Sequence, residues 1–462
     1  MLFNSLEFLL LFLPIVLAVA SRLRKNAFLG WICAASLVFY GFAGHAWFLI
    51  PMVVTTVLDF WVGQRLPSAS GAKKKALLLL SLSGNLGLLA YFKYSGLLVR
   101  TAREAAALFG VDGTSWALAL HVVLPAGISF YTFQTLSYVL DIYRGHAKPE
   151  KSFFAYVAFV AFFPHLVAGP LTRHNQLIPQ LEKASLGMSP RWSAGVMLFS
   201  IGLCKKVLIA DRVALWNDPI IDDIASAGLA GSWVAALGYA VQIYFDFSGY
   251  SDMAIGLGRL FGIELPQNFD SPYKATDPSD FWRRWHITLS QWLRDYLYIS
   301  LGGNRQGAVR TKINLMITMA LGGLWHGANW TFMVWGIFHG LLLVVHHTMG
   351  ERWDRLPLVF RRSSMFVLVC IGWVFFRAKS MTHAGTWLAG MAGTHGLGLA
   401  QANLGKVGVI VAVALIIANV APNPYEKDSL SRARPTLALL GLATAVAVVM
   451  MNYSSKFLYF QF

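Results

Sequence analysis

Two histidines in the stretch 277–340 have surroundings that suit proton transfer, His286 and His326. His286 follows the segment FWRRW, and His326 ends an apolar run and precedes the segment GANW. A neutral imidazole in a site of low dielectric constant can accept the proton of a hydroxyl group, because burial lowers the pKa of histidine. We therefore predict that His326 is a general base. The alternative is a core histidine that only hydrogen-bonds a carbonyl group.

The apolar run Ile313–Trp325 is expected to hold His326 at membrane depth. Its 13 residues rise only about 20 Å as a helix, which is less than the roughly 30 Å hydrocarbon core of a bilayer. We expect Gly322 and Gly323 to break this run and leave the histidine inside the membrane. An ionisable side chain at that depth is costly and indicates a functional site.

Residues on either side of His326 are expected to support it. Trp325 directly precedes it, and Asn329 follows it by three residues, close enough to orient the ring from the same helix face. On a continuous helix, His339 would point about 220° away from His326. We therefore expect His339 to lie outside the site.

A helix is predicted from Pro278 to about Ser300, and it would carry His286. Asp277 is a favoured N-cap residue, proline suits the first helical position, and a further acid follows near the positive end of the helix dipole. At about 100° per residue, an aromatic face that includes Trp285 packs against the protein. A second, polar face combines His286 with Arg283, Ser290 and Arg294.

The composition predicts a membrane protein. Hydrophobic residues make up 56% of the 462 residues and charged residues 13%, which excludes a soluble multidomain protein. The net charge of +16 comes from basic residues in short loops, so cytoplasmic anchoring and contact with anionic membrane lipid explain it better than nucleic acid. The three cysteines lack the spacing of metal ligands, and we expect neither a metal nor a bound cofactor.

The apolar runs predict an all-α polytopic membrane protein with about 10–12 transmembrane helices, and with re-entrant or in-plane helices around a central cavity. One domain is expected over 1–462, with N-terminal spans in 1–115, a catalytic core in about 116–350 and C-terminal spans in 351–462. The basic loops predict that both termini lie outside the cytoplasm. The run Phe153–Gly169 is expected to be a broken segment beside the cavity.

Long motifs link the chain to a known family. The segments FWRRWHITLSQWLRDYLYISLGGNR (281–305) and LGGLWHGANWTFMVWGIFHG (321–340) resemble the membrane-bound O-acyltransferase family, specifically the bacterial branch that contains the alginate O-acetyltransferase membrane subunit. Three further segments resemble the same family: LPAGISFYTFQTLSYVLDIYRG (124–145), FFPHLVAGPLTRHNQLIPQL (162–181) and YFDFSGYSDMAIGLGRLFGIELPQNFDSPY (244–273). The resemblance therefore covers most of the chain.

This resemblance implies an O-acyltransferase of the bacterial inner membrane. It would move acetyl groups from a cytoplasmic donor such as acetyl-coenzyme A towards an extracytoplasmic polysaccharide, either an alginate-like exopolysaccharide or a cell-wall glycan. It also implies a separate extracytoplasmic acetyltransferase as partner protein. His286 would have a second catalytic role, and a structural or donor-binding role stays open for it. Arg283, Arg294 and Lys274 are candidates for holding the donor's phosphates, and the alternative is anchoring at the membrane surface.

A transporter or channel is the alternative function. Broken segments would form its translocation site, and histidines would relay protons. No inverted repeat is visible in the sequence, which argues against it. A structural role is favoured for His165 and His174, and the roles of His339, His346 and His347 stay open. Haem ligation by His339 and His346 is disfavoured because no second ligating segment has matching spacing.

Overall fold

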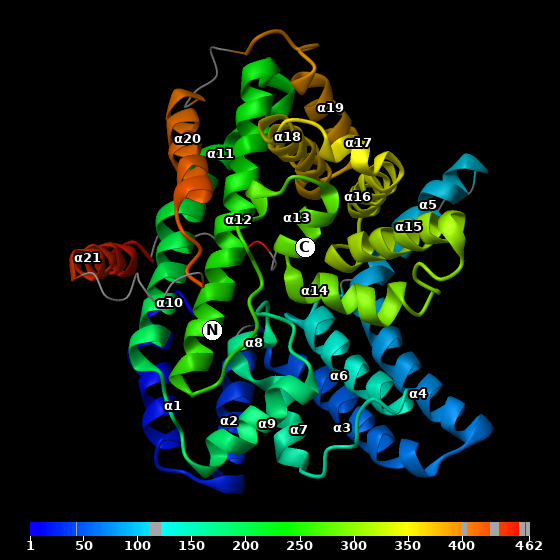
Figure 1. Ribbon diagram of the computed structural model, residues 1–462, viewed down its shortest axis with the longest axis vertical. Coiled ribbons are helices and arrows are strands. Elements are labelled where there is room, and N and C mark those ends of the chain that lie inside the picture. Colours follow the sequence, from blue (N-terminus) through cyan, green and yellow to red (C-terminus); the bar gives the residue numbers. More distant parts are fainter. Residues whose placement is uncertain (43, 111–121, 399–403, 426–433, 452–457, 459–462) are drawn as a thin grey trace. The chain divides into compact units, whose positions relative to one another are not determined.

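The computed structural model describes residues 1–462 except 43, 111–121, 399–403, 426–433, 452–457 and 459–462. All regular secondary structure in this part of the chain is helical (Figure 1), so the all-α prediction is confirmed. The chain forms two compact units, and each is described by itself. Unit 1 is Met1–Gly195 with Ala254–Pro266, and unit 2 is Val196–Met253 with Gln267–Phe462. The single domain over 1–462 and its internal boundaries stay predictions.

The polytopic membrane class is also confirmed. Among the described residues, five helical stretches are long and apolar enough to cross a membrane: Ala46–Ser68, Gly71–Leu108, Trp192–Asp222, Trp330–Met349 and Leu358–Arg377. Three shorter helices are also apolar: Phe8–Ala20, Leu404–Val420 and Pro435–Met450. The number of crossings and the side on which each terminus lies stay predictions.

Unit 1 contains the helices α1 to α9. Their bounds are α1 (Leu13–Ala20), α2 (Lys25–Gly41), α3 (Leu49–Arg65), α4 (Gly71–Leu89), α5 (Ser95–Leu108), α6 (Ile128–Tyr143), α7 (Phe153–Ala161), α8 (Phe163–Leu166) and α9 (His174–Leu186). The predicted break in Phe153–Gly169 is confirmed, because Phe162 (φ −50°, ψ 105°) separates α7 from α8. Asp59 joins α3 to α4 by accepting hydrogen bonds from Ser81 at 2.6 Å and Asn85 at 2.8 Å.

Unit 2 holds the stretch with the two candidate histidines. It shares two helices with unit 1: α10 (Trp192–Cys204), whose first residues belong to unit 1, and α12 (Gly228–Leu260), whose last residues belong to unit 1. Its remaining helices are α11 (Asp211–Asp222), α13 (Pro278–Arg284), α14 (Ile287–Trp292), α15 (Gly307–His326), α16 (Trp330–Met349), α17 (Glu351–Asp354), α18 (Leu358–Arg377), α19 (Met381–Met391), α20 (Leu404–Val420) and α21 (Arg434–Met450).

Helices α15 and α16 form a hairpin whose backbones touch at two glycines. A Cβ atom on Gly323 would overlap the carbonyl oxygen of Phe332, and a Cβ atom on Gly336 would overlap the carbonyl oxygen of Met319. The predicted break at Gly322 and Gly323 is wrong, since both lie inside α15, which has 20 residues. These glycines let the two helices approach each other, and they do not end a helix.

The predicted continuous helix from Pro278 to Ser300 is also wrong. Its start is confirmed, since the Asp277 carboxylate caps α13 by accepting a hydrogen bond from the backbone N–H of Asp280 at 2.8 Å. The helix breaks at His286, which has φ 43° and ψ 53°, before α14 continues into a π-helical turn over Leu293–Tyr298.

The break has a cause in a segment that lies earlier in the chain. The backbone N–H of Asp270 donates to the carbonyl oxygen of Arg284 at 2.9 Å, and the N–H of Ile287 donates to the carbonyl oxygen of Asn268 at 2.9 Å. These two bonds take the carbonyl of Arg284 and the N–H of Ile287 away from the helical pattern, in which each N–H bonds the carbonyl four residues earlier.

Candidate active site

The two candidate histidines lie next to each other in unit 2. The ring centroids of His286 and His326 are 6.2 Å apart, with 60° between the ring planes. Trp325 contacts both rings, with centroid distances of 6.0 Å to His286 and 5.0 Å to His326. Both histidines are buried. His326 is the last residue of α15 and His286 lies at the break before α14, so two elements supply the pair.

Asn268 determines which nitrogen of His286 carries hydrogen. Its Oδ1 lies 3.1 Å from Nδ1 of His286 and also accepts hydrogen bonds from the backbone N–H of Thr288 at 3.3 Å and its hydroxyl at 2.9 Å. The Thr288 N–H fixes this orientation, because a reversed amide would direct its own N–H groups at that donor. Since the amide oxygen only accepts, Nδ1 of His286 is protonated and the lone pair is on Nε2.

The charge state of His286 follows from its burial. Burial lowers the pKa of His286 to about 3, because the charged imidazolium is poorly solvated there. The ring is therefore neutral near pH 7, with Nε2 as a hydrogen-bond acceptor. This neutral state suits a group that accepts or positions a proton.

Aromatic rings enclose the histidine pair. His326 packs against Trp335 at a centroid distance of 5.1 Å and against Phe376 at 5.2 Å. Trp285 is buried and contacts Trp373 at 4.8 Å, as the packing face predicted for it requires. Rings of this size exclude water, so charges that develop in the site interact more strongly than in solvent.

Comparison with known proteins gives this site its chemical context. Residues 146–378 match the sequence profile of MBOAT, the membrane-bound O-acyltransferase family. The chain is 37% identical to the probable alginate O-acetylase AlgI of Pseudomonas putida, with 100% of both chains covered. It belongs to the membrane-bound O-acyltransferase family.

Two further relatives cover nearly the same length. The probable alginate O-acetylase AlgI of Pseudomonas aeruginosa is 40% identical over 95% of this chain and 85% of its own. The peptidoglycan O-acetyltransferase of Helicobacter pylori is 34% identical over 100% of this chain and 98% of its own. The chain is therefore a membrane O-acyltransferase, which decides against the transporter or channel that the sequence alone left open.

His339 lies near the site of this acyltransferase, on the other side of Trp335 from His326, and the expectation that it lies outside the site stays a prediction. Trp335 contacts both histidines, with centroid distances of 5.1 Å to His326 and 4.9 Å to His339. The two histidines lie on α15 and α16, so the angle calculated for one continuous helix does not apply. His339 is fully buried, and neither ring nitrogen has a hydrogen-bond partner among the described residues. This environment suits packing better than proton transfer.

Asn329 has a different role from the one expected. It is the N-cap of α16, where its Oδ1 accepts from the backbone N–H of Thr331 at 3.3 Å. Its Nδ2 donates to the carbonyl oxygen of Lys379 at 3.0 Å. Because α15 ends at His326, Asn329 does not share a helix face with it, and the predicted orienting contact is wrong.

The three basic candidates for donor binding are not gathered at one point. The side chains of Arg283 and Arg294 are 67% and 61% exposed, and each lies near a carboxylate of its own segment, Asp280 at 3.8 Å and Asp295 at 2.7 Å. Lys274 is partly buried in a 3₁₀ turn. No contact joins any two of the three within the described part of the chain. Their donor-binding role stays a prediction.

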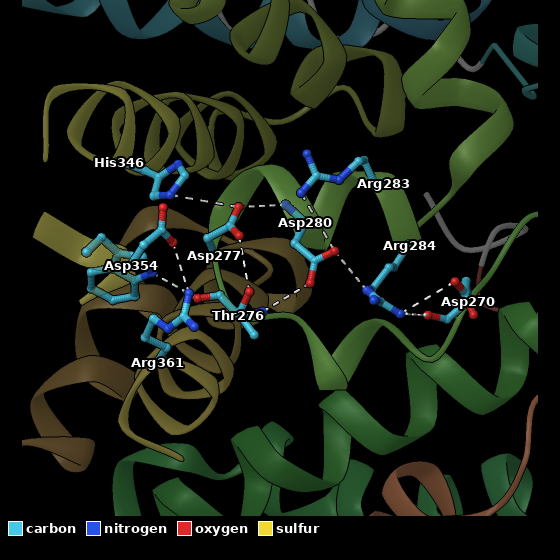
Figure 2. Close-up of polar contacts among 10 residues, drawn as sticks. Asp270, Thr276, Asp277, Asp280, Arg283, Arg284, His346, Asp354 and Arg361 are labelled. Carbon is cyan, nitrogen blue, oxygen red and sulfur yellow. Dashed lines mark hydrogen bonds and ion pairs between the residues drawn. The ribbon is translucent and has the colours of Figure 1, made fainter. Parts of the chain in front are cut away.

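Arg284 and Asn268 are two site-forming residues that the sequence reasoning missed. Figure 2 shows Arg284 between two carboxylates, with Nε 2.9 Å from Oδ1 of Asp280 and Nη1 3.5 Å from Oδ2 of Asp270. Arg284 therefore ties α13 to the segment that carries Asn268. The spacing of Asp280 and Arg284, four residues apart, signals the first contact, but no local signal marks Asn268 as the partner of His286.

Figure 2 also shows His346 beside the N-cap of α13. Its Nε2 lies 4.0 Å from Oδ1 of Asp277, the N-cap of α13. In unit 1, His165 has two partners: its Nε2 donates to the carbonyl oxygen of Phe159 at 3.1 Å, and its Nδ1 accepts from Nε2 of Gln134 at 2.5 Å. These contacts fit the structural role expected for His165.

Proposed function

We propose that this acyltransferase moves an acetyl group from a cytoplasmic acyl-coenzyme A donor towards a hydroxyl group of an extracytoplasmic polysaccharide. The observation that carries the proposal is the buried pair of His286 and His326, 6.2 Å apart between ring centroids. The names of the relatives, which refer to alginate and peptidoglycan, support an alginate-like exopolysaccharide or a cell-wall glycan as the final acceptor.

His326 is the general base of the proposed reaction. Its imidazole takes the proton of the acceptor hydroxyl as the oxygen attacks the acetyl carbonyl carbon. The carbon–sulfur bond to coenzyme A then breaks, and the leaving thiolate takes the proton from the imidazolium. His286 has its hydrogen on Nδ1, so its Nε2 accepts a hydrogen bond from a donor group next to the reacting hydroxyl, whose one proton goes to His326.

The proposal also includes how the donor is bound and which protein receives the acetyl group. Arg283, Arg294 and Lys274 hold the donor phosphates, and the exposure of the two arginine side chains supports access to a large anion. The acceptor hydroxyl belongs to a separate extracytoplasmic acetyltransferase, which then passes the acetyl group to the polysaccharide. The enzyme lies in the bacterial inner membrane, with both termini on the extracytoplasmic side as the loop charges predict.

The test uses the full-length protein in proteoliposomes with isotope-labelled acetyl-coenzyme A and alginate oligosaccharide. Release of free coenzyme A, together with labelled polysaccharide or labelled protein, is expected for the wild type and not for His326→Gln. If the wild type releases no more coenzyme A than the variant, either with alginate oligosaccharide or with peptidoglycan fragments, the proposed donor and base are wrong.

A further inference from the structure

Unit 2 contains a cavity of about 470 Å³ that the proposed reaction does not use. Side chains of α10, the π-helical turn Lys205–Ala210, α12, α20 and α21 line it, together with residues of the segments 269–271 and 421–425. Most of these side chains are apolar. Sites that bind small organic molecules have volumes of about 300–1,000 Å³, are mostly apolar and contain a few polar groups that orient the ligand.

The polar groups of the cavity are centred on Lys205. Its Nζ lies 2.6 Å from Oδ2 of Asp252, and the hydroxyl of Tyr425 donates to Oδ1 of the same carboxylate at 2.7 Å. An ammonium group has three N–H donors, and Asp252 is the single acceptor that the described residues offer to Lys205. Its side chain is only 16% exposed, so water reaches it poorly. The cavity therefore suits a ligand that brings an acceptor oxygen to Lys205.

The charge of this group favours an uncharged acceptor. The charges of Lys205 and Asp252 cancel each other. A phosphate or carboxylate group that approached the ammonium group would therefore be repelled by the Asp252 carboxylate. A carbonyl oxygen accepts a hydrogen bond without that repulsion. An ester carbonyl is such an acceptor.

Part of the cavity wall is exposed apolar surface. Ile417 on α20 and Leu437 and Leu439 on α21 line the cavity and are themselves exposed, Leu439 to 67%. Both helices are apolar along their length. In a polytopic membrane protein, exposed apolar side chains on such helices face lipid, so an acyl chain can enter the cavity from the bilayer.

We propose that this cavity binds an acyl chain of an ester-linked membrane lipid, with Lys205 donating a hydrogen bond to the ester carbonyl oxygen. Phe269 lines the cavity and stacks on His286 at a centroid distance of 6.4 Å. One aromatic ring thus separates the lipid site from the histidine pair. The lipid exchanges with the surrounding bilayer and takes no part in acyl transfer.

Photocrosslinking of the purified full-length protein tests the site. The probe is diacyl phosphatidylcholine with a diazirine in the middle of one acyl chain. We expect saturable labelling of α20 and α21 at the cavity, competed by unlabelled diacyl phosphatidylcholine. Ala443→Trp places an indole in the cavity and should abolish the saturable part of the labelling. Ala445→Trp is the matched control, because Ala445 is exposed on the same helix outside the cavity, and it should label like the wild type.

A second probe tests the hydrogen bond without changing the protein. A diether phosphatidylcholine with the same diazirine lacks the ester carbonyl, and it should bind about tenfold more weakly, as expected when a hydrogen bond to a charged group is lost. Equal saturable labelling by the ester and ether probes would overturn the role of Lys205. Saturable labelling of Ala443→Trp at the wild-type level, or labelling that no competitor reduces, would overturn the site itself.

Discussion

Replacing His326 by glutamine removes the proposed base and keeps a polar side chain at the end of α15. A positioned general base contributes about 10²- to 10⁴-fold to the rate of a reaction. That factor corresponds to about 3–5 kcal/mol of activation free energy. Glutamine can donate and accept hydrogen bonds but cannot take up the proton, so we expect His326→Gln to lose acetyl transfer by this factor.

The same substitution should leave the protein folded. The imidazole of His326 contacts the rings of Trp335 and Phe376, and losing an aromatic pair costs about 0.5–1.5 kcal/mol. The close approach of α15 and α16 at Gly323 and Gly336 is unchanged. The variant should therefore insert into membranes and purify with the yield of the wild type, which separates a catalytic defect from a folding defect.

The assay measures coenzyme A release and acetyl incorporation in proteoliposomes, normalised to folded protein. His339→Leu is the control, because it replaces a buried imidazole that has no hydrogen-bond partner among the described residues by an apolar side chain of similar volume. Swaps that conserve volume usually cost less than about 1.5 kcal/mol of stability. If His326→Gln keeps its rate and His339→Leu loses it, the base has been assigned to the wrong histidine.

Four further substitutions test the surroundings of the pair. Asn268→Ala removes the acceptor that holds His286, and it should lower kcat about tenfold with little change in KM; an unchanged kcat would contradict the positioning role. Gly336→Val should prevent a stable fold, since its side chain would overlap the Met319 carbonyl, and a wild-type melting temperature would refute this packing. Arg283→Ala and Arg294→Ala should raise KM for acetyl-coenzyme A and leave kcat unchanged; an unchanged KM in both would indicate simple membrane anchoring.

The sequence predicted those features of the site that depend on local chemistry. The N-cap at Asp277 was correct because a carboxylate followed by proline acts on the next three residues alone. The break at His286 could not be predicted in this way, because it depends on backbone bonds from Asn268 and Asp270. Local helix signals in 277–300 contain no information about that pairing partner.

The glycines of α15 also show that local sequence signals do not reveal contacts with another helix. A Gly–Gly pair lowers helix propensity, which made a break at Gly322 and Gly323 a reasonable prediction. The structure keeps the helix because Gly336 of α16 packs against it, and the backbone contact compensates for the weaker local preference. The meeting of His286 and His326 was equally inaccessible, because it requires the positions of α14 and α15 relative to each other.

The backbone of His286 indicates why the site depends on such distant contacts. A residue other than glycine with positive φ costs about 1–3 kcal/mol, and His286 (φ 43°) and Ser271 (φ 45°) both have this conformation. Ser271 directly follows the paired segment 268–270, and His286 lies within the paired segment 284–287. The two backbone bonds of this pairing and the side-chain bonds to Asn268 contribute about 0.5–1.5 kcal/mol each, enough to offset the strain. The position of the His286 imidazole is therefore set by Asn268 and its segment, and a helix that continued through residue 286 would remove the histidine from this contact.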